Sequence, residues 1–125
     1  YQITHEDYIG GRIFEDALSY SYYPIDLHVE EGVTPKHLVD SAVATVPLRA
    51  LIPKKSTNMI VAGRCVSSDQ LANSALRVQA SCMGMGQVAG AVAGVACKTN
   101  TSPAQVPLNE VRKILKEHGA IVPQK

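Results

Sequence analysis

Residues 81–97 form a long uncharged stretch that limits the possible folds of this chain. They contain no charged residue and consist mainly of Gly, Ala, Val and Met. Gly86, Gly90 and Gly94 recur every four residues, so a helix would place them on one face. Because glycine costs about 1 kcal/mol relative to alanine inside a helix, three glycines on one face require a compensating contact.

Three interpretations of this stretch compete. A membrane helix could use a G-x-x-x-G face, but Gly, Ala, Ser and Gln favour insertion far less than Leu, Ile and Phe, and no aromatic belt flanks the stretch. A buried helix could use its glycines to lie close to a sheet. A ligand-binding helix would offer the unpaired N–H groups of its first turn, expected near Met83, to phosphate or to ring carbonyls.

The composition narrows the classes of function. The chain has 125 residues, of which 46% are hydrophobic and 18% charged, as expected for one globular domain. Its net charge of +1 gives no basic surface for nucleic acid or for a membrane, so we expect neither as a partner. The 3 cysteines include no C-x-x-C pair and the 4 histidines are scattered, so we expect no metal. Unpaired thiols are compatible with a reducing compartment such as the cytoplasm.

Local patterns predict several elements. Thr4, with Asp7 three residues later, predicts a short capped helix that ends at Gly10 and Gly11. Residues 22–28 are expected to be extended around Pro24. Residues 46–52 and 59–63 are predicted strands, the second buried in a parallel sheet. Residues 108–118 predict an amphipathic helix, with apolar positions at Leu108, Val111 and Leu115 and a stop at Gly119.

The order of strand, polar loop and glycine-rich helix across residues 59–97 is typical of dinucleotide sites in open α/β sheets. The fold class we predict is therefore α/β, with short parallel strands. The spacing G-M-G-Q-V-A-G differs from G-x-G-x-x-G, and no acidic residue can be assigned to a ribose.

Residues 58–94, NMIVAGRCVSSDQLANSALRVQASCMGMGQVAGAVAG, resemble a known family. They are similar to the C-terminal FAD-binding segment of bacterial FAD-dependent oxidoreductases with a glutathione-reductase-like Rossmann fold. The matching parts are residues 58–64, 67–69, 74, 76–78 and 82–90. Upstream, VPLRALIPK resembles the strand that re-enters the FAD domain, and YPIDLH resembles the stretch before it.

The resemblance implies a set of cofactor contacts. Gly63 and Arg64 would lie beside the pyrophosphate and the ribityl chain of FAD. The helix that follows would direct its N–H groups at the carbonyl edge of the flavin and stabilise negative charge on the reduced ring. The positions carried over as cofactor-binding are Gly63, Arg64, Ser67, Ser68, Gly84, Met85, Gly86 and Gln87.

The resemblance also implies a division of the chain. Residues 1–45 would be the tail of the substrate-side region, 46–100 the C-terminal FAD-binding segment, and 101–125 a helix and tail. The chain starts with Tyr1 and lacks the G-x-G-x-x-G unit that would bind adenosine diphosphate. We therefore expect a fragment that is inactive alone, with the rest of the same polypeptide, a small-molecule substrate and possible further copies of the chain as partners. Gln70 stands where the family often has His, which argues against acid–base chemistry there.

Two residues are candidates for catalysis, each with a structural alternative. Arg77 could pair with a substrate carboxylate or the flavin, or be a surface arginine. His28 could be a general acid or base, although a lone histidine is more often only hydrogen-bonded.

Arg64, a predicted cofactor contact, could bind phosphate or form an ion pair with Asp69. A packing module without enzymatic activity, using the small-residue helix at an interface, is the alternative to an oxidoreductase.

Overall fold

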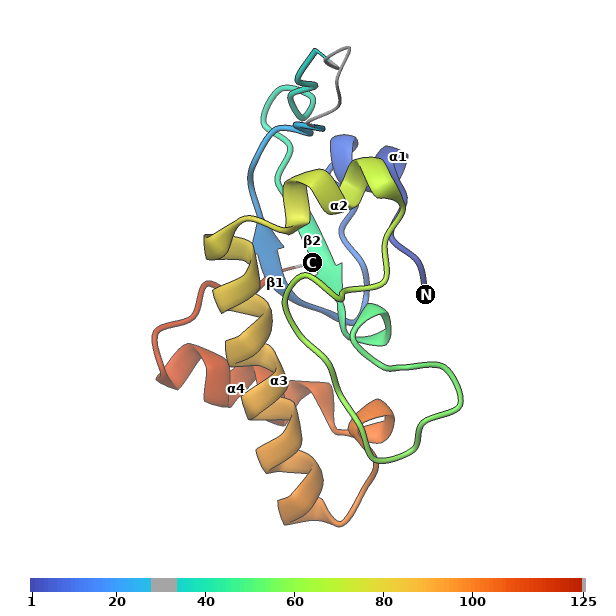
Figure 1. The fold of residues 1–125 in the computed structure, drawn as a ribbon. Helices are drawn as coiled ribbons and strands as arrows, with labels where there is room; N and C mark the ends of the chain where they lie inside the picture. Colours follow the sequence, from blue (N-terminus) through green and yellow to red (C-terminus); the bar gives the residue numbers. More distant parts are fainter. Residues whose placement is uncertain (28–33, 125) are drawn as a thin grey trace.

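A computed structural model describes residues 1–27 and 34–124 of the chain. Two short strands lie at its centre, with α1 and α2 at one end and the long helix α3 crossing α4 at the other (Figure 1). The elements are α1 (His5–Ile9), β1 (Ala17–Ser21), β2 (Ala44–Pro47), α2 (Gln70–Leu76), α3 (Gln79–Thr99) and α4 (Leu108–Glu117), with 3-10 turns at Leu48–Ala50 and Pro103–Gln105.

The capped helix near the N-terminus is confirmed. The Thr4 side chain accepts a hydrogen bond from the Asp7 N–H group, and the Asp7 carboxylate accepts one from the Thr4 N–H group. Gly10 caps the C-terminal end, and Gly11 follows with a φ of 61°. The signals for α1 lie entirely within these residues, which is why the sequence was sufficient to predict it.

The sheet differs from the prediction. β1 and β2 pair antiparallel, with a register irregularity between Ala17 and Ser19, whereas parallel strands were expected. β1 was not predicted. Outside the two strands, Ile25 forms an antiparallel bridge with Lys36, which confirms extended backbone at that point, and Ile3 forms an isolated parallel bridge with Ser68. The described residues are therefore mixed helix and strand, consistent with a fragment of an α/β domain.

The strand predicted at residues 46–52 is wrong in its bounds. It begins earlier, at Ala44, and stops at Pro47, which has no N–H group with which to continue the ladder. The chain then turns through Leu48–Ala50, where the Leu51 N–H group donates to the Leu48 carbonyl at 2.8 Å. The carboxylate of Asp16 accepts the Arg49 N–H group at 3.0 Å and holds this turn against β1.

The strand predicted at residues 59–63 is absent from the described structure. The Val61 N–H group donates to the Leu51 carbonyl at 2.9 Å, but no neighbouring strand completes a ladder. Met59 is exposed, and Ile60, Val61 and Ala62 are only half-buried. An apolar run becomes a strand only when a partner strand pairs with its backbone, and this chain segment has none among the described residues.

The core lies between the sheet and the helices. Leu18 and Val46 from the sheet are buried in the same cluster as Val92 from α3 and Leu115 from α4. The amphipathic pattern of α4 is confirmed, because Val111 and Leu115 are buried and Gly119 ends the helix with a φ of 79°.

Helix α3 buries one face and leaves its glycine face open. Met85, Val88, Val92 and Val95 are buried, whereas Gly86, Gly90 and Gly94 are exposed. A Cβ atom added at any of these three glycines would meet nothing within 4 Å. The predicted close approach of the glycines to a sheet is therefore not made by the described residues.

The same helix is long and apolar enough to cross a membrane by length and composition alone. An 18-residue window has a mean hydropathy of 1.4, and 33% of it is buried in this structure. A core helix of a water-soluble protein meets the same criterion, so this property does not distinguish a bilayer from a protein surface as the environment of the open face.

Candidate functional site

The break between α2 and α3 is the focus of the candidate site. Asp69 is the N-cap of α2, and its side chain accepts the Ala72 N–H group at 2.7 Å, while Arg77 is the C-cap. Val78 is extended, with φ −66° and ψ 151°, and a new helix begins immediately after it. The chain thus changes direction within two residues, without glycine or proline.

The first turn of α3 has no cap. Val78 cannot cap with its side chain, and the first bond of the helix runs from the Cys82 N–H group to the Val78 carbonyl at 3.0 Å. Within the described part of the chain, the N–H groups of Gln79, Ala80 and Ser81 have no partner. A helix of 21 residues therefore presents three free donors and the positive end of its dipole at this point.

Gly63 and Arg64 lie beside this helix start. Gly63 has a φ of 84°, which disfavours a side chain, and a Cβ atom built on it would lie 4.0 Å from Cys82. The Arg64 Nε donates to the Arg77 carbonyl at 3.3 Å, and Asn73 donates its amide to the Arg64 carbonyl. The structure therefore brings Gly63 and Arg64, both predicted cofactor contacts, together with the end of α2 and the start of α3.

Arg77 lies at the same junction and orders a neighbouring segment. Its guanidinium donates to the Asp26 carbonyl at 3.3 Å, while the Asp26 N–H group donates to the Ser74 hydroxyl at 3.1 Å. Among the described residues the Asp69 carboxylate pairs with His5, and the ion pair considered between Arg64 and Asp69 is not formed. Two guanidinium groups and an uncapped helix end thus lie close together, an arrangement that favours an anionic or carbonyl-rich ligand.

The remaining predicted contacts lie elsewhere. Ser67 and Ser68 lie beside the chain before α1, where the Ile3 N–H group donates to the Ser67 carbonyl at 2.9 Å. Ser68 accepts the Asn73 amide at 3.1 Å, which links this loop to α2. Ser67 is exposed and lines a pocket of about 750 Å³ together with Tyr1, Lys54, Val61 and Cys65.

The helix start predicted near Met83 is wrong, because α3 begins four residues earlier at Gln79. Gly84, Met85, Gly86 and Gln87 therefore lie in the second and third turns, where their N–H groups belong to the helix ladder. Met85 is fully buried in the core, and the exposed Gln87 donates to the His118 carbonyl at 3.4 Å. His28, the other catalytic candidate, lies outside the described residues.

A chain of buried hydroxyl groups links the first turn of α3 to β1 and α1. The Ser81 hydroxyl is 2.7 Å from that of Ser21 on β1, which is 3.0 Å from the Tyr8 hydroxyl on α1. All three side chains are buried, and burial raises the pKa of Tyr8 above its usual value of 10.0, so the phenol stays protonated. No sequence motif predicts this cluster, because Tyr8 and Ser21 are 13 residues apart and Ser21 and Ser81 are 60 residues apart.

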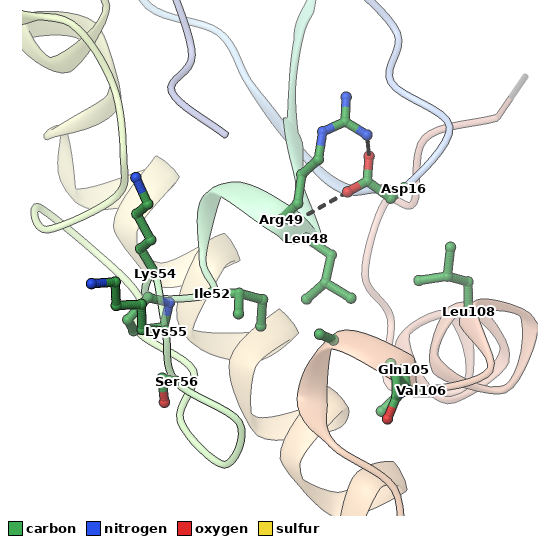
Figure 2. A pocket seen from close by; sticks show the side chains of 12 residues that line it. Asp16, Leu48, Arg49, Ile52, Lys54, Lys55, Ser56, Gln105, Val106 and Leu108 are labelled. Atoms are coloured by element: carbon green, nitrogen blue, oxygen red, sulfur yellow. Dashed lines mark hydrogen bonds and ion pairs between the residues drawn. The ribbon is translucent and has the colours of Figure 1, made fainter.

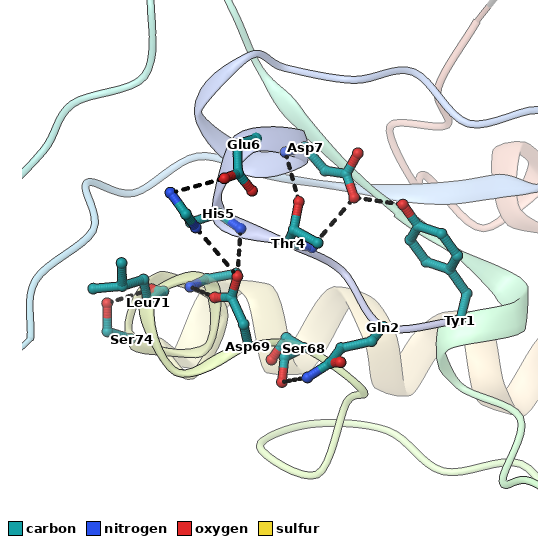
Figure 3. Close-up of polar contacts among 11 residues, drawn as sticks. Tyr1, Gln2, Thr4, His5, Glu6, Asp7, Ser68, Asp69, Leu71 and Ser74 are labelled. Atoms are coloured by element: carbon teal, nitrogen blue, oxygen red, sulfur yellow. Dashed lines mark hydrogen bonds and ion pairs between the residues drawn. The ribbon is translucent and has the colours of Figure 1, made fainter.

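A second polar cluster joins α1 to α2 (Figure 3). The two ring nitrogens of His5 lie 3.2 Å from Glu6 and 3.4 Å from Asp69, and the three side chains are near enough for a metal ion to be considered. The Asp69 carboxylate, however, is already occupied by the His5 and Ala72 N–H groups. Because each ring nitrogen of His5 faces a different carboxylate, the cluster is better suited to joining the two helices than to holding an ion.

A pocket of about 570 Å³ lies between the 3-10 turn at Leu48–Ala50 and the chain before α4 (Figure 2). Its wall carries Arg49, which forms an ion pair with Asp16 at 2.8 Å, and the exposed Lys54 and Lys55. The Arg49 guanidinium also lies over the rings of Tyr1 and Phe14. The contacts of Arg49 therefore stabilise the fold. The residues that line this pocket do not form a recognisable catalytic site.

Comparison with known proteins decides the family. The family model described as FAD dependent oxidoreductase matches residues 1–115. The chain belongs to the FAD-dependent oxidoreductase family. No curated protein and no solved structure gives a significant match. Oxidoreductases of this family use FAD, and the uncapped start of α3 beside Gly63 and two arginines suits the polar, anionic character of such a cofactor.

Proposed function

We propose that this chain is the C-terminal part of a FAD-dependent oxidoreductase of the glutathione-reductase-like Rossmann class found in bacteria, and that it supplies the flavin-side contacts. The observation that carries the proposal is the uncapped N-terminus of α3 beside the left-handed turn at Gly63, in a chain that belongs to this family. In such an enzyme FAD accepts a hydride from a small-molecule substrate.

The residues of the junction have separate roles in this proposal. The free N–H groups of Gln79, Ala80 and Ser81 bind the carbonyl edge of the flavin, which takes over the part that the sequence assigned to Gly84–Gln87. Gly63 lets the backbone approach the cofactor without a side chain in the way. The exposed guanidinium of Arg64 neutralises the pyrophosphate. Ser67 and Ser68 stay as proposed outer contacts.

Arg77 and His28 stay as the candidates that act on the substrate. Arg77 is half-buried at the junction, with its guanidinium donating to the Asp26 carbonyl. In this proposal it anchors the extended segment at Ile25 and Asp26 against the helix start and offers its remaining N–H groups to a substrate carboxylate. His28 follows that segment in the chain and is proposed as an acid or base.

The open surfaces fit a piece of a larger fold. We propose that the rest of the same polypeptide covers the glycine face of α3 and pairs with the half-exposed backbone of residues 59–63, which would then complete the parallel sheet. On its own the chain would lack the adenosine side of the cofactor site and would be inactive. In a homo-oligomer, a second copy of the chain would cover the glycine face instead.

Flavin binding by the complete protein tests this function. Purified complete protein should be yellow, and flavin-free protein should take up FAD in a calorimetric titration. Arg64→Ala should weaken FAD binding about tenfold, the effect of one lost charged hydrogen bond. Lys98→Ala is the matched control, because Lys98 is an exposed cation at the opposite end of α3.

The alternative function, a packing module without enzymatic activity, is favoured by one observation, the open small-residue face of α3. The same titration separates the two. A colourless native preparation that takes up no FAD would contradict the oxidoreductase and leave the packing module.

A further inference from the structure

The buried hydroxyl chain of Tyr8, Ser21 and Ser81 joins three elements that are distant in the sequence. Tyr8 comes from α1, Ser21 from β1 and Ser81 from the first turn of α3. Their exposed fractions are 1%, 3% and 4%, so the two links of 3.0 Å and 2.7 Å are shielded from water. Shielded hydrogen bonds are electrostatically stronger than exposed ones and are costly to break.

The protons of the chain have one consistent direction. The Tyr23 N–H group donates to the Tyr8 oxygen at 3.2 Å, and the Tyr8 hydroxyl donates to the Tyr23 carbonyl at 3.0 Å. Because the proton of Tyr8 is committed there, Ser21 donates to Tyr8 and Ser81 donates to Ser21. The helix start is therefore tied through Ser81 to a strand and to the backbone of Tyr23.

Helix α3 needs such an anchor at this end. Its first turn has no cap and three N–H groups without a partner among the described residues, and the local side-chain bonds there are the long ones from the Cys82 thiol to the carbonyls of Leu76 and Arg77, at 3.7 and 3.5 Å. A first turn of this kind frays readily in an isolated helix. Ser81 supplies the only side-chain hydrogen bond that joins the Gln79–Ser81 turn to β1 within the described chain.

We propose that Tyr8, Ser21 and Ser81 are positioning residues that fix the free N–H groups of α3 in register with the flavin and thereby set its reduction potential. This inference rests on the proposed function, and it adds three side-chain hydroxyl groups that touch no cofactor themselves, although the backbone N–H group of Ser81 is one of the proposed donors. A fixed donor set stabilises developing negative charge without reorganisation, whereas a mobile set must be ordered first. Loss of the chain should therefore make the bound flavin harder to reduce.

Ser19 provides a matched control on the same strand. It lies two residues before Ser21, on the same side of β1, and is also buried, at 7% exposed. Its Cβ faces Gly84 of α3 at 3.8 Å from an added Cβ, so it packs against the same helix. It makes no side-chain hydrogen bond to α3 among the described residues, so Ser19→Ala removes a buried hydroxyl of the same type without touching the chain.

The experiment compares Ser21→Ala and Ser19→Ala in the complete FAD-bound protein by redox titration. Ser21→Ala should lower the preference for reduced over oxidised flavin about tenfold, which is about 30 mV for a two-electron couple. Ser81→Ala should give the same shift, and alanine suits the helix should Ser21→Ala fold poorly. Ser19→Ala should leave the potential unchanged. Equal shifts for Ser19→Ala and Ser21→Ala, or no shift for Ser21→Ala and Ser81→Ala, would overturn the proposal.

Hydrogen exchange separates this inference from the proposed function. In flavin-free protein, the amides of residues 82–85, which close the first turns of α3, should exchange about tenfold faster in Ser21→Ala and Ser81→Ala, and at the parental rate in Ser19→Ala. Unchanged exchange would refute the anchoring of the helix start. Accelerated exchange in a protein that takes up no FAD would refute the oxidoreductase and the role in reduction potential, and would leave only the anchor.

Discussion

Helices α3 and α4 cross in the core, but they differ in whether their apolar faces have partners within the chain. α4 (Leu108–Glu117) is amphipathic, and its buried residues Val111 and Leu115 meet a partner within the chain. α3 has no charged residue before Lys98, and a Cβ atom added at Gly86, Gly90 or Gly94 would meet nothing within 4 Å among the described residues. Packing inside this chain explains the sequence of α4, whereas the sequence of α3 is also suited to packing against a surface outside this chain.

The largest expected effect tests the face that the helices share. Leu115→Ala should lower the free energy of unfolding by about 2–5 kcal/mol, because it opens a cavity between α4 and α3. Lys113→Ala, on the exposed side of α4, should change it by less than about 0.5 kcal/mol. Chemical denaturation measures both, and a small loss for Leu115→Ala would mean that the α3–α4 contact contributes little.

The next effect tests whether the glycine face of α3 is covered in the complete protein. Gly86→Leu adds a side chain where the described residues leave open space, so the described chain alone gives it no cost beyond an exposed apolar group. With the rest of the fold packed on this face, overpacking should destabilise the complete protein by about 1–3 kcal/mol. Lys113→Leu on α4 is the control, and equal thermal stability of the two variants would show that the glycine face is bare.

A smaller effect compares the glycine that follows α4 with a glycine in the interior of α3. Gly119 follows α4 with a φ of 79°, so Gly119→Ala should cost about 1–2 kcal/mol in backbone strain. The same change at Gly94, in the interior of α3 and with no neighbour within 4 Å, should instead gain about 1 kcal/mol in the described chain. Opposite signs in thermal denaturation are expected, and a loss at Gly94 would again indicate a covered face.

The smallest effect concerns α1, which like α4 has its determinants within the chain. Asp7→Asn should cost about 1 kcal/mol, since it weakens the capping box and removes the ion pair with Arg12 at 2.7 Å. Burial alone would raise the pKa of Asp7, but hydrogen bonds from Tyr1, Arg12 and the Thr4 N–H group outweigh it and lower the pKa below 3.8.

This lowered pKa gives the Asp7 effect a pH dependence. A carboxylate with a depressed folded-state pKa stabilises the fold above its unfolded pKa and loses that contribution as pH falls through the folded value. The stability difference between Asp7→Asn and the parent should therefore be full near neutral pH and shrink below about pH 4. A difference that stays constant down to pH 2 would show that the charge of Asp7 contributes nothing.

Elements whose causes are local could be predicted from the sequence. The capping box of α1, the apolar stripe of α4 and the uncharged helix around residues 81–97 were all predictable, because a few neighbouring residues specify each. The family resemblance predicted Gly63 and Arg64 as contacts of the pyrophosphate and ribityl chain of FAD, and the structure places both residues beside the start of α3.

Tertiary structure decided what depends on distant partners. β1 and β2 exist because they pair with each other, and residues 59–63 fail to form a strand because no described strand pairs with them. The start of α3 at Gln79 follows from a break at Val78 that has no sequence signal. The two hydrogen bonds of the Tyr8–Ser21–Ser81 chain join residues 13 and 60 positions apart, since hydroxyl groups meet only after the backbone has folded.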